Sequence, residues 1–159
     1  MKKEQFLKIT ILLLIITTSI LLSGCLTKNK KEDKTLITNF INTFYTYNEY
    51  DFEPYEEYLT STAYEDFCIK RAIGGNLSGR FIDDVELQVL DLSIKPQDNP
   101  NPDLHSYKIS FTLKDKISME ETPVELNLHL GKEDNEWKIN ENNILTSLLT
   151  PLIPYLKIN

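Results

Sequence analysis

The fold is decided by two stretches of alternating sequence, Ser106-Tyr107-Lys108-Ile109-Ser110-Phe111-Thr112-Leu113-Lys114 and Val124-Glu125-Leu126-Asn127-Leu128-His129-Leu130. In both stretches an apolar side chain occupies every second position, which is the period of a β-strand with one buried face. A polar turn separates them, so we expect two antiparallel neighbours in one sheet. The apolar face that they share then needs a covering layer.

The residues on either side extend this sheet. In 84–95 the apolar positions are 85, 87 and 89, and then 90, 92 and 94, so the alternation slips by one residue between Val89 and Leu90. A β-bulge at the slip keeps both apolar sets on the same face. Residues 96–103 contain three prolines and predict a turn, and a short last strand is expected around Trp137.

The N-terminal part of the chain has helical periodicity instead. From Thr35 to about Tyr50 apolar residues recur at spacings of one, three and four, which predicts an amphipathic helix with Thr35 as its N-cap. Pro54 is expected in the first turn of a second helical region, residues 55–72. We expect a break in that region at Thr60-Ser61-Thr62, where Ser61 or Thr62 caps a third piece.

Two segments have more than one interpretation. Gly74–Gly79 holds three glycines, and we expect a loop from helices to sheet rather than a phosphate-binding loop, because no Lys-Ser/Thr pair follows. The tail, 141–159, has helical spacing from Ile144 to Leu149. It is expected to plug the open side of the sheet, or to be an exposed apolar arm that docks on a partner or the bilayer.

Helices followed by an antiparallel sheet make this an α+β chain. The order and length of the elements over 35–140, with the closing Asn135-Glu136-Trp137-Lys138-Ile139-Asn140, resemble the nuclear transport factor 2-like superfamily, a cone-shaped, cystatin-like fold. The resemblance implies N-terminal helices packed on a curved antiparallel sheet, here with a short C-terminal helix added. Members often dimerise through the outer sheet face. That face is polar here, so a monomer or weak dimer is expected.

The N-terminal sequence is typical of a secretion signal. Lys2 and Lys3 precede fourteen uncharged residues, 9–22, which is shorter than a membrane-spanning helix requires. The following Leu22-Ser23-Gly24-Cys25 resembles the lipobox of bacterial lipoproteins. This resemblance implies cleavage between Gly24 and Cys25, acylation of Cys25 with palmitate-like chains, and attachment to the extracytoplasmic face of the cell membrane. We therefore expect a signal peptide at 1–24, a lipidated cysteine and polar tether at 25–34, and one domain at 35–159.

Charge narrows the class of partner. The chain holds 17 basic and 24 acidic side chains, a net charge of -7. Residues 1–24 contain three lysines and one glutamate, which leaves a net charge of -9 for residues 25–159. Because phosphates repel such a domain, nucleic acid is not expected as a partner. With Cys25 acylated, Cys68 has no disulfide partner and is expected to be a buried, inert thiol.

Catalytic groups are scarce in this sequence. His105 and His129 have no ligand-spaced partner, so we expect no metal, no cofactor and no catalytic residue. Enzymes of the resembled superfamily tend to place Asp, His, Tyr or Arg inside the cone, and here the candidates for such a group are Asp66, Tyr64 and Tyr107.

Aromatic and acidic residues are concentrated in 45–58. Ring faces and carboxylates both attract Lys and Arg, so this segment is a candidate surface for a cationic protein or peptide. The alternative is that the rings pack in the core and the carboxylates face water. Calcium is disfavoured because the segment lacks the ligand spacing of a dedicated site. The candidate partner-binding residues are Tyr47, Tyr50, Asp51, Glu53, Tyr55, Glu56 and Glu57.

The function expected from the sequence is that of a non-enzymatic, membrane-anchored lipoprotein that binds or scaffolds a protein or peptide at the cell envelope. The alternatives are a small-ligand binder or hydrolase that uses the cone cavity, and an accessory factor of a conjugation or secretion machine.

Overall fold

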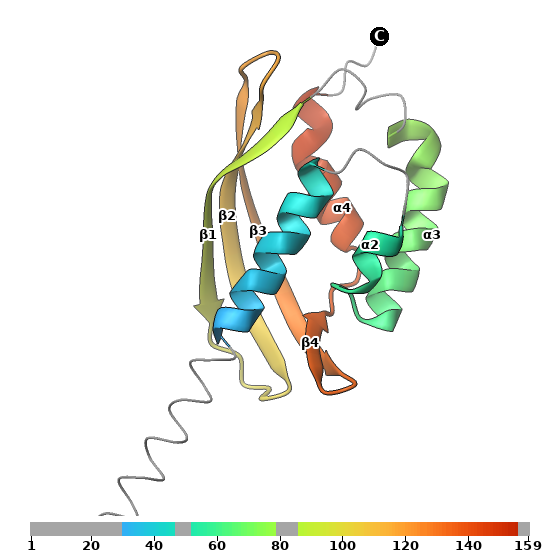
Figure 1. Cartoon of the computed structure of the whole chain (residues 1–159), viewed down its shortest axis with the longest axis vertical. Coiled ribbons are helices and arrows are strands. Elements are labelled where there is room, and N and C mark those ends of the chain that lie inside the picture. The colour runs from blue at the N-terminus through green and yellow to red at the C-terminus, as the bar shows by residue number, and fades with distance from the viewer. Residues whose placement is uncertain (1–29, 47–51, 79–85, 156–159) are drawn as a thin grey trace, which may run out of the picture. The chain divides into compact units, whose positions relative to one another are not determined.

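The computed structural model describes residues 30–46, 52–78 and 86–155 (Figure 1). Contacts divide the chain into two units, which meet between Thr35 and Leu36, and the second unit holds the sheet and the helices that follow. The α+β class is confirmed. After the helix of residues 30–46, the elements are α2 (Glu53–Glu56), α3 (Ser61–Ser78), β1 (Leu87–Gln97), β2 (Leu104–Asp115), β3 (Glu121–Glu133), β4 (Glu136–Ile139), α4 (Ile144–Leu149) and the 3-10 helix η1 (Thr150–Tyr155).

The four strands form one curled antiparallel sheet in the order β1-β2-β3-β4 (Figure 1). The pairing of β2 with β3 sets Tyr107 opposite Leu128 and Phe111 opposite Val124, so the apolar positions of the two strands share one face. The antiparallel sheet and its buried face are thus confirmed. The buried side chains are Tyr107, Ile109, Phe111, Leu113, Val124, Leu126, Leu128 and Leu130.

A bulge is present in β1, but it lies two residues beyond the predicted slip. The register shifts between Leu90 and Ser93, and Asp91 has a positive φ of 55°. An aspartate tolerates this left-handed conformation better than the leucines beside it, which explains the position of the bulge. Val89 and Leu92 pack against the core on either side of it.

The N-cap expected at Thr35 is wrong. Helix is present from Lys30, so part of the segment expected as a polar tether is helical. The Thr35 hydroxyl donates to the carbonyl oxygen of Lys31 at 3.0 Å, a bond from inside a helix rather than from its cap. Lys and Glu are good helix formers, and this preference explains the earlier start.

The helical region that follows is broken near the expected place, and Pro54 does lie in the first turn of α2. The cap of α3 is Thr60, not Ser61 or Thr62, because the Ala63 N–H donates to Thr60 Oγ1 at 3.4 Å. Helix α3 also continues to Ser78, through most of the segment expected as a glycine loop. A helical glycine costs only about 1 kcal/mol relative to alanine, so this helix accommodates the pair.

The C-terminal segment contributes to the core. Ile144, Leu145 and Leu148 of α4 are buried, as is Leu152 of η1. The Tyr45 hydroxyl donates to the Leu148 carbonyl oxygen at 2.9 Å, and burial raises the pKa of this phenol. The Tyr45 ring also lies 5.5 Å from that of Phe111, so one side chain contacts both α4 and β2. For residues 144–152 the exposed-arm interpretation is therefore wrong, while 156–159 lie outside the described residues.

Candidate functional site: the acidic surface beside β4

The outer edge of β4 is paired with the turn between α2 and α3. Leu59 forms a parallel bridge with Ile139. The Ile139 N–H donates to the Tyr58 carbonyl oxygen at 2.8 Å, and the Thr60 N–H donates to the Ile139 carbonyl oxygen at 3.0 Å. This pairing occupies an edge that otherwise attracts strands of other chains. It also brings α2 next to the β3–β4 hairpin, which is distant in sequence.

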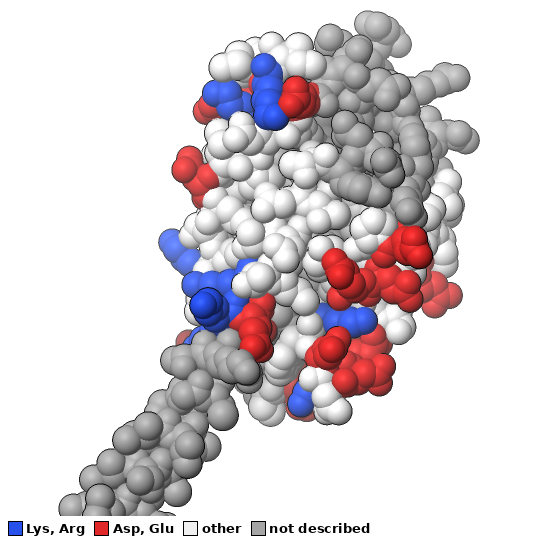
Figure 2. Space-filling view, viewed as in Figure 1, with Lys and Arg blue, Asp and Glu red and all other residues white. Residues whose placement is uncertain are grey.

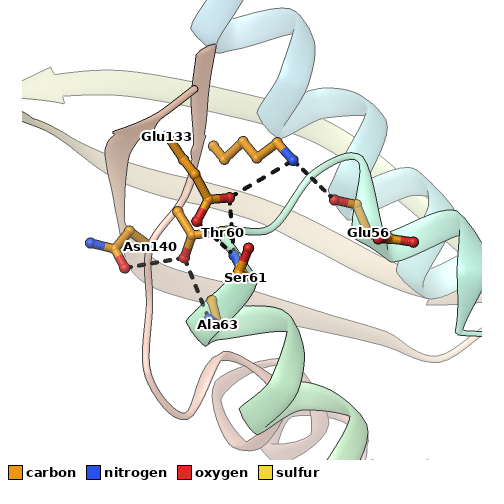
Figure 3. Close-up of polar contacts among 7 residues, drawn as sticks. Glu56, Thr60, Ser61, Ala63, Glu133 and Asn140 are labelled. Atoms are coloured by element: carbon orange, nitrogen blue, oxygen red, sulfur yellow. Dashed lines mark hydrogen bonds and ion pairs between the residues drawn. The ribbon is translucent and has the colours of Figure 1, made fainter. Parts of the chain in front are cut away.

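Side chains reinforce this junction (Figure 3). The Ser61 N–H donates to both carboxylate oxygens of Glu133 at 3.1 Å, which places a negative charge at the N-terminus of α3. A carboxylate is stabilised there by the helix dipole and the free N–H groups. Thr60 Oγ1 donates to Asn140 Oδ1 at 3.3 Å, so the residue that caps α3 also contacts the chain just after β4.

Lys138 links the two acidic segments of this junction. Its Nζ lies 4.0 Å from Glu133 Oε2 and donates to the Glu56 carbonyl oxygen at 3.5 Å. Figure 2 shows Asp and Glu gathered over this part of the molecule, with few Lys or Arg among them. We call the set of carboxylates contributed by α2 and the β3–β4 hairpin the acidic surface: Glu53, Glu56, Glu57, Glu133, Asp134 and Glu136.

The predicted partner-binding residues divide into three groups. Glu53, Glu56 and Glu57 are exposed, and the structure places them on the acidic surface. Tyr47, Tyr50 and Asp51 lie outside the described residues. The proposal of Tyr55 as a contact residue is corrected, because its side chain is fully buried.

The local geometry explains the burial of Tyr55. Its ring lies 4.8 Å from that of Phe67 and 6.4 Å from that of Phe40. In a helical turn Glu53, Glu56 and Glu57 share one side, which leaves Tyr55 on the other. The ring therefore belongs to the core and the carboxylates belong to the surface.

The carboxylates of the β3–β4 hairpin were not predicted as part of a site. Asp134 and Asn135 both have positive φ and connect β3 to β4 as a two-residue turn, so Glu133 and Glu136 flank it directly. The signal in the sequence is a Glu-Asp-Asn-Glu run between two strands. Nothing in that run indicates that α2 lies beside it.

The candidates for a polar group inside the sheet have structural roles or remain at its margin. Asp66 accepts hydrogen bonds from Lys70 Nζ and from the Asn143 N–H, the latter at 3.0 Å, and so fastens the start of α4 to α3. The Lys70 bond, followed by the Asn143 bond, holds the pKa of Asp66 below its ordinary value. Tyr107 is a buried core residue, and Tyr64 is half-buried.

The two histidines lie apart. His129 Nδ1 is 2.6 Å from Glu141 Oε2, on the face of β3 away from the buried positions, as its phase predicts. The His105 ring stacks on that of Trp137 with centroids 3.7 Å apart.

Cys68 is half-buried against the core. The part of the chain that the structure describes contains no group of three or more His, Cys, Asp or Glu able to hold a metal ion.

None of the described helices is both long enough and apolar enough to span a bilayer. Among known proteins, no family model matches the chain, and no curated protein matches it. What the described geometry offers is a charged surface next to a closed sheet edge, an arrangement suited to contact with a cation-rich partner.

Proposed function

We propose that the protein is a lipoprotein, held on the extracytoplasmic face of a cell membrane through acylated Cys25, and that its domain binds a protein or peptide at the envelope. The observation that carries the proposal is Leu22-Ser23-Gly24-Cys25, placed directly after fourteen uncharged residues that follow a basic start. Residues 1–29 lie outside the described part of the chain, so this step depends on the sequence.

The packing of the domain supports binding rather than turnover. The side of the sheet that resembles a cone interior holds Phe111, Leu128 and Leu130 from the strands, with Ile144 and Leu148 from α4, and all five are buried. Catalysis needs convergent polar groups in a recess. Apolar side chains occupy those positions here, which disfavours the small-ligand and hydrolase alternative.

We further propose that the partner is cationic and meets the acidic surface. Residues 25–159 carry a net charge of -9, and Glu53, Glu56 and Glu57 are solvent-exposed in α2 and directly after it. Complementary charge raises association rates and selects among partners more than it adds affinity. The expected signature is binding that weakens as ionic strength rises, because salt screens exposed charges beyond about 10 Å at 0.1 M.

The finer fold assignment is also a proposal. Helices ahead of a curled four-stranded antiparallel sheet, with a bulged first strand, support a nuclear transport factor 2-like domain. In this assignment the N-terminal helices cover the concave face of the sheet. The contact between Tyr45 and Phe111 supports that arrangement.

The lipid anchor is tested with the chain's two cysteines. Cells that express the full chain are fed an alkyne analogue of palmitate, and the protein is then coupled to a dye. We expect wild-type protein and the matched control Cys68→Ser to be labelled in the membrane fraction, and Cys25→Ser to be unlabelled. Equal labelling of Cys25→Ser and wild type, or no labelling of either, contradicts the proposal.

A further inference from the structure

The turn between β2 and β3 presents two apolar side chains to solvent. Ile117 is 66% exposed and Met119 is 62% exposed, the highest values among the large apolar side chains that the structure describes. We call residues 116–120 the β2–β3 tip. Exposed apolar side chains that lie together, rather than singly, mark sites of interaction.

The β2–β3 tip is held in one conformation by a buried carboxylate. Asp115, only 4% exposed, accepts hydrogen bonds from the N–H groups of Ile117 and Ser118, both at 3.0 Å, and from the Glu86 N–H at 3.3 Å. The Met119 N–H donates to the Asp115 carbonyl oxygen at 2.8 Å. These bonds fix the backbone between the two exposed side chains.

Met119 occupies a conformation that most residues avoid. Its φ is 63°, in the left-handed region that glycine adopts without a steric penalty. A side chain in this position is held away from the sheet and into solvent, with Ile117 two residues before it. Such preorganisation lowers the entropy lost when a partner immobilises the pair.

The surroundings of the tip are acidic. Lys114 pairs with Glu121 at 3.0 Å, and Lys116 pairs with Glu86, which lies just before β1, so each lysine already has a carboxylate beside it. Glu120 is also exposed, so among the residues that the structure describes around the tip the carboxylates outnumber the lysines. A matching surface therefore carries Lys or Arg around an apolar centre.

We propose that the β2–β3 tip inserts Ile117 and Met119 into an apolar, basic-rimmed pocket on an envelope protein. This inference rests on the proposed envelope location, and the negative rim of the tip favours a basic partner over an anionic bilayer. A second copy of the chain is disfavoured, because two tips in contact bury far less than the roughly 800 Å² that each partner contributes to a stable pair.

The test uses photo-crosslinking in the full-length lipoprotein in its own membrane. The residue p-benzoylphenylalanine replaces Ile117, and in separate strains it replaces Ile153, an equally apolar control that is 56% exposed, or Glu56 on the acidic surface. We expect a discrete adduct with another protein at position 117 and none at position 153. The adduct is identified by mass spectrometry, and its partner is purified.

Affinity measurements with the purified partner then distinguish binding in a specific pocket from a crosslink that reflects proximity alone. Ile117→Ser/Met119→Ser is expected to weaken binding of the purified partner more than tenfold. The matched control Ile69→Ser/Ile153→Ser removes similar exposed apolar area and is expected to change affinity less than twofold. Thermal unfolding of both variants checks that the fold is retained. Equal affinities for the two variants overturn the proposal.

Three other outcomes also overturn it. These are no adduct at position 117 beyond that at 153, an adduct only with a second copy of the chain, and quenching of a fluorophore at position 119 by brominated lipid in phosphatidylethanolamine–phosphatidylglycerol vesicles. An adduct at Glu56 without one at Ile117 removes the tip proposal and leaves the proposed function standing. Absence of palmitate labelling removes the proposed function instead.

Discussion

The two hairpin turns at opposite ends of β3 both reverse the chain, but they differ in length and in the residues that stabilise them. The β3–β4 turn is two residues, Asp134 and Asn135, both with positive φ and both of types that tolerate it. The β2–β3 turn is longer, places Met119 at positive φ, and depends on the buried carboxylate of Asp115. One turn is stable through local preference and carries charge. The other needs a buried polar support and presents apolar side chains.

The two turns are stabilised by different interactions. The short turn follows from residues whose own side chains favour the left-handed conformation. The longer turn is stabilised by three backbone N–H groups that donate to the carboxylate of Asp115. Substitutions that remove the support should therefore affect one end of the sheet and leave the other intact.

The largest expected effect is that of Asp115→Ala. It leaves the N–H groups of Glu86, Ile117 and Ser118 without their acceptor, and each group that stays unsatisfied costs about 1–3 kcal/mol. We expect the free energy of unfolding, measured by urea denaturation, to fall by about 3 kcal/mol, with loss of hydrogen-exchange protection around residues 116–120. Asp115→Asn keeps one acceptor oxygen and should lose less.

The same carboxylate sets a pH dependence. The Ser118 hydrogen bonds, with those from Ile117 and Glu86, hold the pKa of Asp115 below its ordinary value in spite of desolvation. A depressed pKa contributes stability that is present above the ordinary pKa and is lost as pH falls through the lowered one. Wild type should therefore lose more stability than Asp115→Asn on acidification below about pH 4. Parallel curves for the two proteins contradict this account.

A smaller effect is expected at the other end, from Gly131→Ala. A Cβ at this position lies 2.9 Å from Asn140 Nδ2, closer than Cβ atoms approach in folded proteins, and 3.1 Å from Asn140 Cβ, which is tighter than most Cβ contacts. Overpacking of this kind typically costs about 1–3 kcal/mol. Thermal and urea unfolding should show this loss, and Asn140→Ala in the same chain should recover part of it. If the two substitutions are additive, the contact between them is not the cause.

The smallest expected effect is that of Met119→Gly. Left-handed backbone costs a non-glycine residue about 1–2 kcal/mol, which glycine avoids, but glycine also loses more entropy on folding. We expect the free energy of unfolding to rise by at most about 1 kcal/mol, while binding of the crosslinked partner weakens. Loss of both stability and binding would mean that Met119 has a structural role rather than a docking role.

Much of the sheet was predictable from the sequence because alternation is a local signal. Each apolar position counted in β2 and β3 is buried, and the bulge in β1 was required by the slip in the pattern. Its position was not predictable from hydrophobicity. It depends on the tolerance of Asp91 for positive φ, which is a property of one residue's backbone.

The candidate site was predictable only in part because it is built from distant segments. Local spacing identified Glu53, Glu56 and Glu57 as an acidic run, but assigned Tyr55 to the same surface although its ring is buried. The carboxylates of the β3–β4 hairpin join them through the pairing of Leu59 with Ile139. No local pattern encodes that pairing, since it depends on how the finished sheet curls.

The bridge between Leu59 and Ile139 also constrains the order in which the molecule can assemble. The two residues are 80 positions apart, so a long loop must close before the bridge forms. A chain that emerges from its N-terminus has α2 and the cap of α3 present long before their partner strand exists. Until residue 139 arrives, the backbone groups of Tyr58 and Thr60 have no sheet to join. Completion of this edge is therefore expected to be a late step in folding.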